Sequence, residues 1–433
     1  MNLYSLPDPS SLVPAELDQL PARAAYVHWP FCQQKCAYCD FISWPGRSCD
    51  MAIYLEWLQH EIEAVGTWSR QHGLTVPLAS VFIGGGTPSL ADPADLAAIL
   101  DLLRVQFGLE PEAEITLEAN PGTLRPGQLA VLRAAGFNRI SFGLQATQDD
   151  LLRTLGRIHT YDDFVTSVRD ARAAGFERIS ADLMLGLPGQ TLADALASVE
   201  RVLALGIDHV SFYSLSIEPG TPFAERYLDH PELLPDEDLE RAIYHAVRDR
   251  LAAAGLVPYE ISNAARPGQE CRHNLVYWRG EPYYGFGIAA HSYLAGVRRG
   301  NTTDWWTYAA AWGGSDERET ARDPAGLEEA AGTQSRPGVR EGVWWPFLAL
   351  ESSEVIDSDE ARKEYFLLGL RLAQGVTWAD YQARFGVAEA ARERFATEFM
   401  RLLDRGLIEL DEIGVRLSQL GLDLANQAFS EFV

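Results

Sequence analysis

The stretch HWPFCQQKCAYCDF, residues 28–41, places three cysteines within eight positions and decides how the rest of the chain is interpreted. A structural zinc site normally takes four protein ligands as two separated pairs, and Cys49 is the one further cysteine near enough to complete such a set. Three thiolates with one coordination position left over suit an iron–sulfur cluster better. We therefore interpret Cys32, Cys36 and Cys39 as cluster ligands, with one iron open to a small molecule.

The composition excludes several classes of partner. The chain has 433 residues with a formal net charge of −25, which argues against binding to nucleic acid or to an anionic membrane surface. No apolar run approaches the roughly 20 residues that span a bilayer, and the first residues lack the layout of a secretory signal. Five cysteines in a chain of this length do not make a disulfide framework. We predict a cytoplasmic protein with reduced thiols.

A repeating unit of strand and helix fills the first half of the chain. Six β-rich runs are found at residues 24–29, 79–86, 114–120, 139–145, 178–186 and 209–217. Amphipathic helical stretches separate them at 52–65, 93–107, 126–135, 160–174 and 191–205. Parallel neighbours need crossover helices, so the pattern predicts an α/β fold, a partial (β/α)6 parallel barrel that is more open than the closed eight-stranded form. Ligands should bind at the carboxyl ends of its strands.

Composition also divides the chain into four parts. Residues 1–23 form an N-terminal segment, and residues 24–312 form the barrel core with an extension on its ligand side. Residues 313–342 contain few large apolar side chains, which predicts a flexible insertion. In residues 343–433, two short β-like pieces, LIELD and GVRLS, bracket a turn between helices. This layout predicts a small winged-helix-like α+β module, which in so acidic a chain is a packing or docking module and not a DNA reader.

Polar residues stand where the predicted strands end. Residues 84–88, GGGTP, form a turn whose missing side chains let a ligand reach backbone carbonyls, although a plain tight turn explains them equally well. Glu118 and Asp182 are carboxylates among apolar neighbours, where an unpaired charge is costly. Gln145 offers a donor and an acceptor to a ribose. Arg157 is either a solvated cation at a helix end or a fork that binds a carboxylate.

Taken in order, the motifs CQQKCAYC, GGGTPS, TLEANP, ISFGLQ and ADLMLGLPGQT resemble those of the radical S-adenosylmethionine (SAM) enzymes, in the branch of the oxygen-independent coproporphyrinogen III oxidases. The resemblance covers about residues 24–310 and the C-terminal module. It implies a [4Fe–4S] cluster on the three cysteines, with SAM chelated at the open iron and cleaved to a 5′-deoxyadenosyl radical. The resemblance further implies SAM contacts from Tyr26, Tyr38, Gly85, Gly86, Thr87, Glu118, Gln145, Arg157 and Asp182.

One position separates this chain from the oxidases of that branch. Their cluster motif reads C-x3-C-x2-C-x-C, whereas Phe41 stands at the last of these positions here. A motif ending in Cys-Asp-Phe, together with a short N-terminal extension, resembles the heme chaperones of the same branch. This resemblance implies that the protein binds heme and delivers it to acceptors such as membrane-bound respiratory enzymes, without coproporphyrinogen oxidase activity. Oxidative decarboxylation of coproporphyrinogen is the alternative function, and a zinc-stabilised scaffold is a third.

The heme chaperones also carry a His-Asn-x-x-Tyr-Trp element, which is present here as HNLVYW, residues 273–278. The match makes His273 the candidate axial ligand of heme iron, since imidazole ligates iron and the aromatic residues behind it can pack a flat macrocycle. Cys271 and His291 are rival ligands. A homodimer is also considered as the assembly of the protein.

Overall fold

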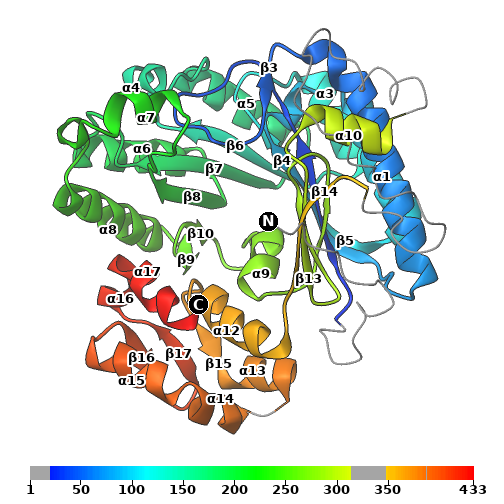
Figure 1. Cartoon of the computed structure of the whole chain (residues 1–433). Helices are drawn as coiled ribbons and strands as arrows, with labels where there is room; N and C mark the ends of the chain where they lie inside the picture. Colours follow the sequence, from blue (N-terminus) through cyan, green and yellow to red (C-terminus); the bar gives the residue numbers. More distant parts are fainter. Residues whose placement is uncertain (1–19, 314–347, 387) are drawn as a thin grey trace, which may run out of the picture.

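One large sheet organises the core of the protein. The computed structural model describes residues 20–313, 348–386 and 388–433. The six predicted strands are present, parallel, and adjacent in chain order. Figure 1 shows them fanning around a common axis. They are β1 (Ala24–Trp29), β4 (Leu78–Gly85), β5 (Leu109–Ala119), β6 (Arg139–Gln145), β7 (Arg178–Leu185) and β8 (His209–Ser214).

Helices between the strands cover the outer face of the sheet. They are α1 (Met51–Gln71), α2 (Pro93–Phe107), α3 (Pro126–Ala135), α4 (Asp149–Thr154), α5 (Tyr161–Ala173) and α6 (Leu192–Ala204). Local sequence sets where they begin: Thr160 accepts a hydrogen bond from the Asp163 backbone N–H, and the Asp163 carboxylate accepts one from Thr160 in return. The same reciprocal capping starts α6 at Thr191. Each helix then buries an apolar face on the strands, which keeps the carboxyl ends of the strands accessible.

The sheet is wider than the sequence predicts. Three further strands extend the six: β11 (Tyr284–Phe286) pairs parallel with β1, while β10 (Asn263–Ala265) and β9 (Val257–Glu260) continue antiparallel beyond β8. The predicted (β/α)6 core is therefore confirmed, and three short strands that were not predicted extend its sheet to nine strands. β11 and β9 are the two edges, so the barrel is open, as predicted.

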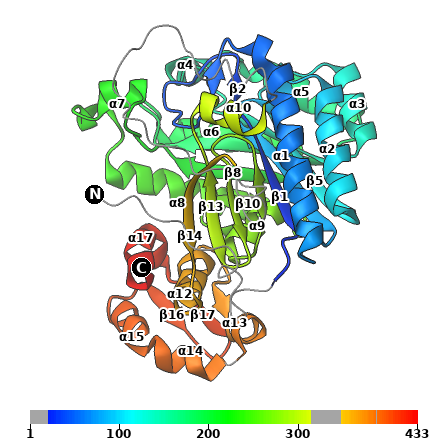
Figure 2. The ribbon, with the colours of Figure 1, turned by 45° about the vertical axis from the view of Figure 1, so that its right-hand side comes forward.

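A second, antiparallel sheet was not predicted. It consists of β12 (His291–Leu294), β13 (Val297–Asn301) and β14 (Leu350–Val355), and it lies beside the core (Figure 2). β14 lies within residues 343–433, which the sequence assigned to the C-terminal module, but it pairs with β13. The C-terminal module therefore begins only after Val355. Besides the six strand–helix units, the core contains α7 (Pro222–Tyr227), α8 (Glu237–Ala253), α9 (Arg272–Trp278) and α10 (Trp305–Trp312).

The C-terminal module has its own hydrophobic core, centred on Phe366 and Phe399. The predicted β-like pieces form β16 (Ile408–Leu410) and β17 (Gly414–Leu417), and a third strand, β15 (Val376–Thr377), joins them. The surrounding helices are α12 (Ser358–Gly369), α13 (Trp378–Phe385), α14 (Ala388–Arg394), α15 (Ala396–Asp404), α16 (Gln419–Asp423) and α17 (Ala425–Phe429). The module contacts the core through His245, whose Nε2 lies 2.6 Å from Asp423 Oδ1.

Two predicted segments lie outside the described residues. These are the N-terminal segment up to residue 19, and the predicted insertion from residue 314 onward. Within the described residues, no helix combines the length and the apolar character that crossing a membrane requires.

Candidate functional site

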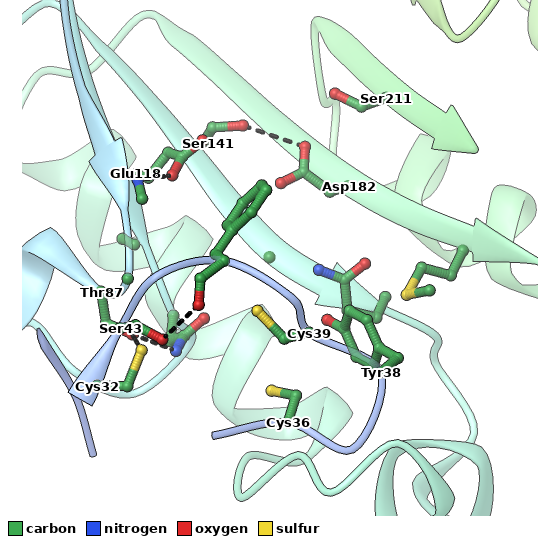
Figure 3. A pocket seen from close by; sticks show the side chains of 18 of the residues that line it. Cys32, Cys36, Tyr38, Cys39, Ser43, Thr87, Glu118, Ser141, Asp182 and Ser211 are labelled. Carbon is green, nitrogen blue, oxygen red and sulfur yellow. Dashed lines mark hydrogen bonds between the residues drawn. The ribbon is translucent and has the colours of Figure 1, made fainter. Parts of the chain in front are cut away.

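A cavity of about 420 Å³ opens at the carboxyl ends of the parallel strands. The predicted cluster loop forms one wall, and polar side chains from β5, β6, β7 and β8 form the other. In Figure 3, Cys32, Cys36 and Cys39 lie on one side and the carboxylates of Glu118 and Asp182 on the opposite side. Eight of the nine predicted SAM contacts line this cavity: Tyr38, Gly85, Gly86, Thr87, Glu118, Gln145, Arg157 and Asp182. The rule that ligands bind at the carboxyl ends of strands therefore located the site.

The three cysteines have free thiols and half-buried side chains. Two of the sulfurs accept hydrogen bonds: Thr87 Oγ1 lies 3.5 Å from the sulfur of Cys32, and Arg157 Nη1 lies 3.3 Å from that of Cys36. Burial raises the pKa of Cys39 to about 11. Metal binding at Cys39 must therefore release a proton. Hydrogen bonds to cluster sulfurs are one of the means by which proteins tune iron–sulfur centres.

The arrangement fits an iron–sulfur cluster better than zinc. A structural zinc site is closed by a fourth protein ligand, and among the described residues no cysteine other than Cys32, Cys36 and Cys39 lines the cavity. A cubane cluster places each thiolate on a different iron, so its cysteines stand apart around a shared space. Cys49 is exposed and faces Asp50 Oδ1 at 3.6 Å, and it does not line the cavity. Phe41 does line it, 56% exposed, where the oxidase motif has a cysteine.

The glycine segment after β4 holds the cluster loop against the sheet. A Cβ on Gly86 would lie 2.7 Å from the Phe31 carbonyl oxygen, and one on Gly85 would lie 2.5 Å from the His28 ring. The backbone N–H groups of Gly86 and Thr87 donate to Trp29 and Phe31 at 2.8 and 2.7 Å. Glycine is required here by this close packing, in addition to any contact with a ligand.

Two carboxylates share the inner wall of the cavity. Glu118 Oε2 accepts a hydrogen bond from the Gly85 N–H at 3.0 Å, and Asp182 Oδ1 accepts one from Ser141 at 3.2 Å. Burial, and then the charge of Asp182, raise the pKa of Glu118 to about 8. Burial also raises the pKa of Asp182, while Arg139 favours the charged form of both carboxylates. Carboxyl groups held in this way can accept hydrogen bonds from ligand hydroxyl or amino groups.

The raised pKa of Glu118 predicts a dependence of stability on pH. The pKa of Glu118 rises from its ordinary value of 4.5 to about 8 in the folded protein. The free energy of unfolding that this group contributes is therefore fully present below pH 4.5 and is lost as the pH rises from 4.5 to 8. Glu118→Gln should match the wild type at pH 5 and exceed it by roughly 1–2 kcal/mol at pH 8.5, since the open cavity screens the group in part. Denaturant unfolding of the SAM-free protein checks this, with exposed Glu112→Gln as control. A constant difference between pH 5 and 8.5 would refute it.

Arg157 and Gln145 meet at the end of β6. Arg157 Nη2 donates to Asn120 Oδ1 and to the Gly143 carbonyl, each at 2.5 Å. Gln145 has a φ of +71°, which is uncommon for a residue other than glycine, and its Oε1 accepts a hydrogen bond from the Tyr213 hydroxyl at 3.0 Å. Such strain is found where a fold positions a side chain for function. These hydrogen bonds exclude the alternative that Arg157 is a solvated cation at a helix end.

Several residues of the cavity wall were not predicted: Asn120, Arg139, Ser141, Ser211 and Tyr213. Asn120 follows β5 directly, so the rule of polar residues at strand ends would have found it. Tyr26, the ninth predicted SAM contact, lies on β1 and is not among the residues that line the cavity, and its hydroxyl lies 2.9 Å from His28 Nδ1.

The proposed heme ligand lies outside the cavity. His273 is 1% exposed, and both of its ring nitrogens have partners: Nδ1 lies 3.0 Å from Ser80 Oγ, and Nε2 lies 2.9 Å from the Tyr277 hydroxyl. Burial lowers its pKa to about 3. This geometry counts against the prediction that His273 ligates iron. Cys271 is fully buried, and burial raises its pKa to about 12, whereas His291 is exposed on β12.

Comparison with known proteins supports this architecture. Residues 26–202 match the model of the radical SAM superfamily, and residues 356–424 match that of the HemN C-terminal domain. The structure of coproporphyrinogen III oxidase (HemN) from Escherichia coli aligns with a TM-score of 0.75, covering 96% of this chain and 91% of that one. Its sequence identity is 22%, so this likeness shows a common fold.

Relatives with higher identity carry another name. "Heme chaperone HemW" of Bacillus subtilis (strain 168) is 35% identical over 95% of this chain and 99% of its own. The protein of that name from Mycobacterium tuberculosis (strain ATCC 25618 / H37Rv) is 36% identical over 85% of each chain. With nearly full-length matches of this identity, the chain belongs to the HemW family of the radical SAM superfamily.

Proposed function

We propose that this protein is a heme chaperone, which binds heme and an iron–sulfur cluster with SAM and delivers the heme to acceptor proteins. The observation that carries this proposal is the match to the B. subtilis heme chaperone over 99% of that protein's length. Phe41 supports it, because a thiolate is absent at the position that distinguishes the oxidases. The resemblance to coproporphyrinogen III oxidase extends to the fold alone.

The residues of the cavity have distinct roles in this proposal. Cys32, Cys36 and Cys39 hold a [4Fe–4S] cluster, and reductive cleavage of SAM is the chemistry that such a cluster supplies when bound. Arg157 and Asp182 bind the carboxylate and the ribose of SAM. The other SAM contacts come from Tyr38, Gly85, Gly86, Thr87, Glu118 and Gln145, while Tyr26 supports the wall through His28.

The proposed function also includes the proteins that accept the heme and the cellular compartment of the chaperone. Membrane-bound respiratory enzymes are the acceptors we propose, and the cytoplasm is the compartment. All five cysteines have free thiols, as a reducing compartment requires. A homodimer is the assembly to test in solution. Of the three heme ligands considered, His291 has the side chain that reaches solvent.

Two parallel assays on the anaerobically reconstituted protein test the proposal. Heme titration should produce a saturable Soret band at about one heme per chain, and incubation with coproporphyrinogen III, SAM and a reductant should leave the substrate unconsumed. Heme titrations of His273→Ala, Cys271→Ser and His291→Ala then identify the ligand. Consumption of coproporphyrinogen without heme binding would establish the oxidase function and refute the chaperone.

A further inference from the structure

A second cavity, of about 470 Å³, lies where the core meets the C-terminal module. Residues of α9, β12 and β13 line it from the core, and residues of α12 and α13 line it from the module. Figures 1 and 2 show these elements grouped at the junction, away from the cluster loop. Its volume is in the range of small-molecule sites, and domain junctions are a common place for such sites.

Aromatic rings from both sides form the walls of this junction cavity. The five rings are Tyr277, Tyr283, Tyr293, Tyr365 and Phe385. Tyr277 and Tyr283, from the core, pack edge to face with ring centroids 4.7 Å apart, and Tyr365 and Phe385, from the module, do so at 5.3 Å. So many rings facing one space favour a ligand with a broad, flat and apolar body.

Two arginines also line the junction cavity. Arg298 Nη2 contacts Glu364 at 2.7 Å, and Arg384 Nη2 donates to the Gly280 carbonyl at 3.0 Å. Guanidinium groups bind carboxylates as forks and stack on aromatic faces. Glu281 and Glu364 balance their charge, and burial raises the pKa of Glu281. Arg298 also pairs with Glu354 at 3.2 Å, so a ligand carboxylate would bind here by exchanging these ion pairs for contacts with the two guanidinium groups, and a highly charged polyphosphate does not suit the wall.

We propose that the junction cavity is the heme site of this protein. The porphyrin ring lies between the aromatic walls of the core and the module, and its two carboxylates contact Arg298 and Arg384. This inference rests on the proposed function, because the aromatic rings and arginines of the cavity suit a flat molecule with carboxylates and heme is the molecule of that kind which the chaperone proposal supplies.

The proposal assigns a new role to the His-Asn-x-x-Tyr-Trp element. Helix α9 contributes to both cavities: Asn274 lines the cluster cavity and Tyr277 lines the junction cavity. His273 bridges Ser80 on β4 and the Tyr277 hydroxyl, so it orients the Tyr277 ring. His273 is therefore a positioning residue for the heme site, which explains a buried histidine in a heme-binding element.

Titrations with heme and with metal-free protoporphyrin IX test this site in the full-length protein. Leu368→Trp places a large side chain in the cavity, and the double variant Arg298→Gln/Arg384→Gln removes both cations. Each should weaken binding of both probes at least tenfold. Arg362→Gln, on α12 but outside the lining, should bind as the wild type does. Metal-free protoporphyrin IX has the ring and the carboxylates of heme but no iron, so its affinity measures the contacts of the ring and carboxylates without any bond to iron.

Cluster absorbance and melting temperature establish that each variant is folded, and either variant suffices if the other does not fold. Wild-type affinity in the folded variants would overturn the junction site and leave the chaperone proposal standing. Failure of the wild type to bind either probe would overturn both.

Discussion

Replacing Cys32, Cys36 or Cys39 with serine is expected to abolish the iron–sulfur cluster. Each variant keeps two cysteine ligands, and no other cysteine lines the cavity among the described residues. Iron and sulfide content should fall to background, and the broad absorbance of the cluster should disappear. The sheet should remain folded, because its core is built from apolar side chains and does not include the three cysteines.

Cys49→Ser is the matched control, since Cys49 is exposed and contacts only Asp50 by its sulfur. It should bind a full cluster. Far-ultraviolet circular dichroism establishes that the variants are folded. Full iron content in all three cavity variants would refute the assignment of the cluster ligands.

Arg157→Ala should weaken SAM binding by about tenfold to a hundredfold. The guanidinium is held by Asn120 and Gly143 in a position facing the cavity, and a lost charge-assisted hydrogen bond costs roughly 1.5–3 kcal/mol. Asp182→Ala should have an effect of the same order. Isothermal titration of cluster-loaded protein with SAM measures both, with iron content showing that the cluster is retained.

Arg153→Ala is the control for Arg157, because Arg153 is exposed on the neighbouring helix α4. Equal SAM affinity in the wild type and in Arg157→Ala would mean that Arg157 serves only to join β5 and β6. If Arg157→Ala lost its cluster while the cluster-loaded fraction bound SAM with wild-type affinity, the contact of Arg157 with Cys36 would be its main role.

Long apolar strands and their end residues were predictable from the sequence. β1 and β4 to β8 are rich in apolar and β-branched residues and are separated by stretches of helical periodicity, so their number and parallel order follow from local pattern. β9 to β11 span three or four residues each, too short for a pattern. β14 joins β13 across residues 314–347, and such a pairing depends on tertiary contacts alone.

The candidate site likewise has features that local sequence predicts and features that depend on tertiary contacts. Residues in the carboxyl-terminal halves of neighbouring parallel strands, such as Glu118 and Asp182, lie toward one edge of the sheet whatever the details of packing. The hydrogen bonds of His273 could not be predicted, because its partner Ser80 lies 193 positions away in the sequence and nothing local reveals that both ring nitrogens are bonded. The junction cavity was not predictable, since Tyr277 and Phe385 meet only once the two modules pack together.

Retention and release of heme by the cluster-loaded protein test the central claim most directly. The protein is loaded with heme, freed of excess heme by gel filtration, and mixed with an apo-hemoprotein that can be separated from it. The account predicts that about one heme per chain stays bound through the filtration and then moves to the apo-protein. Loss of all heme during filtration, or permanent retention in the presence of the acceptor, would contradict it.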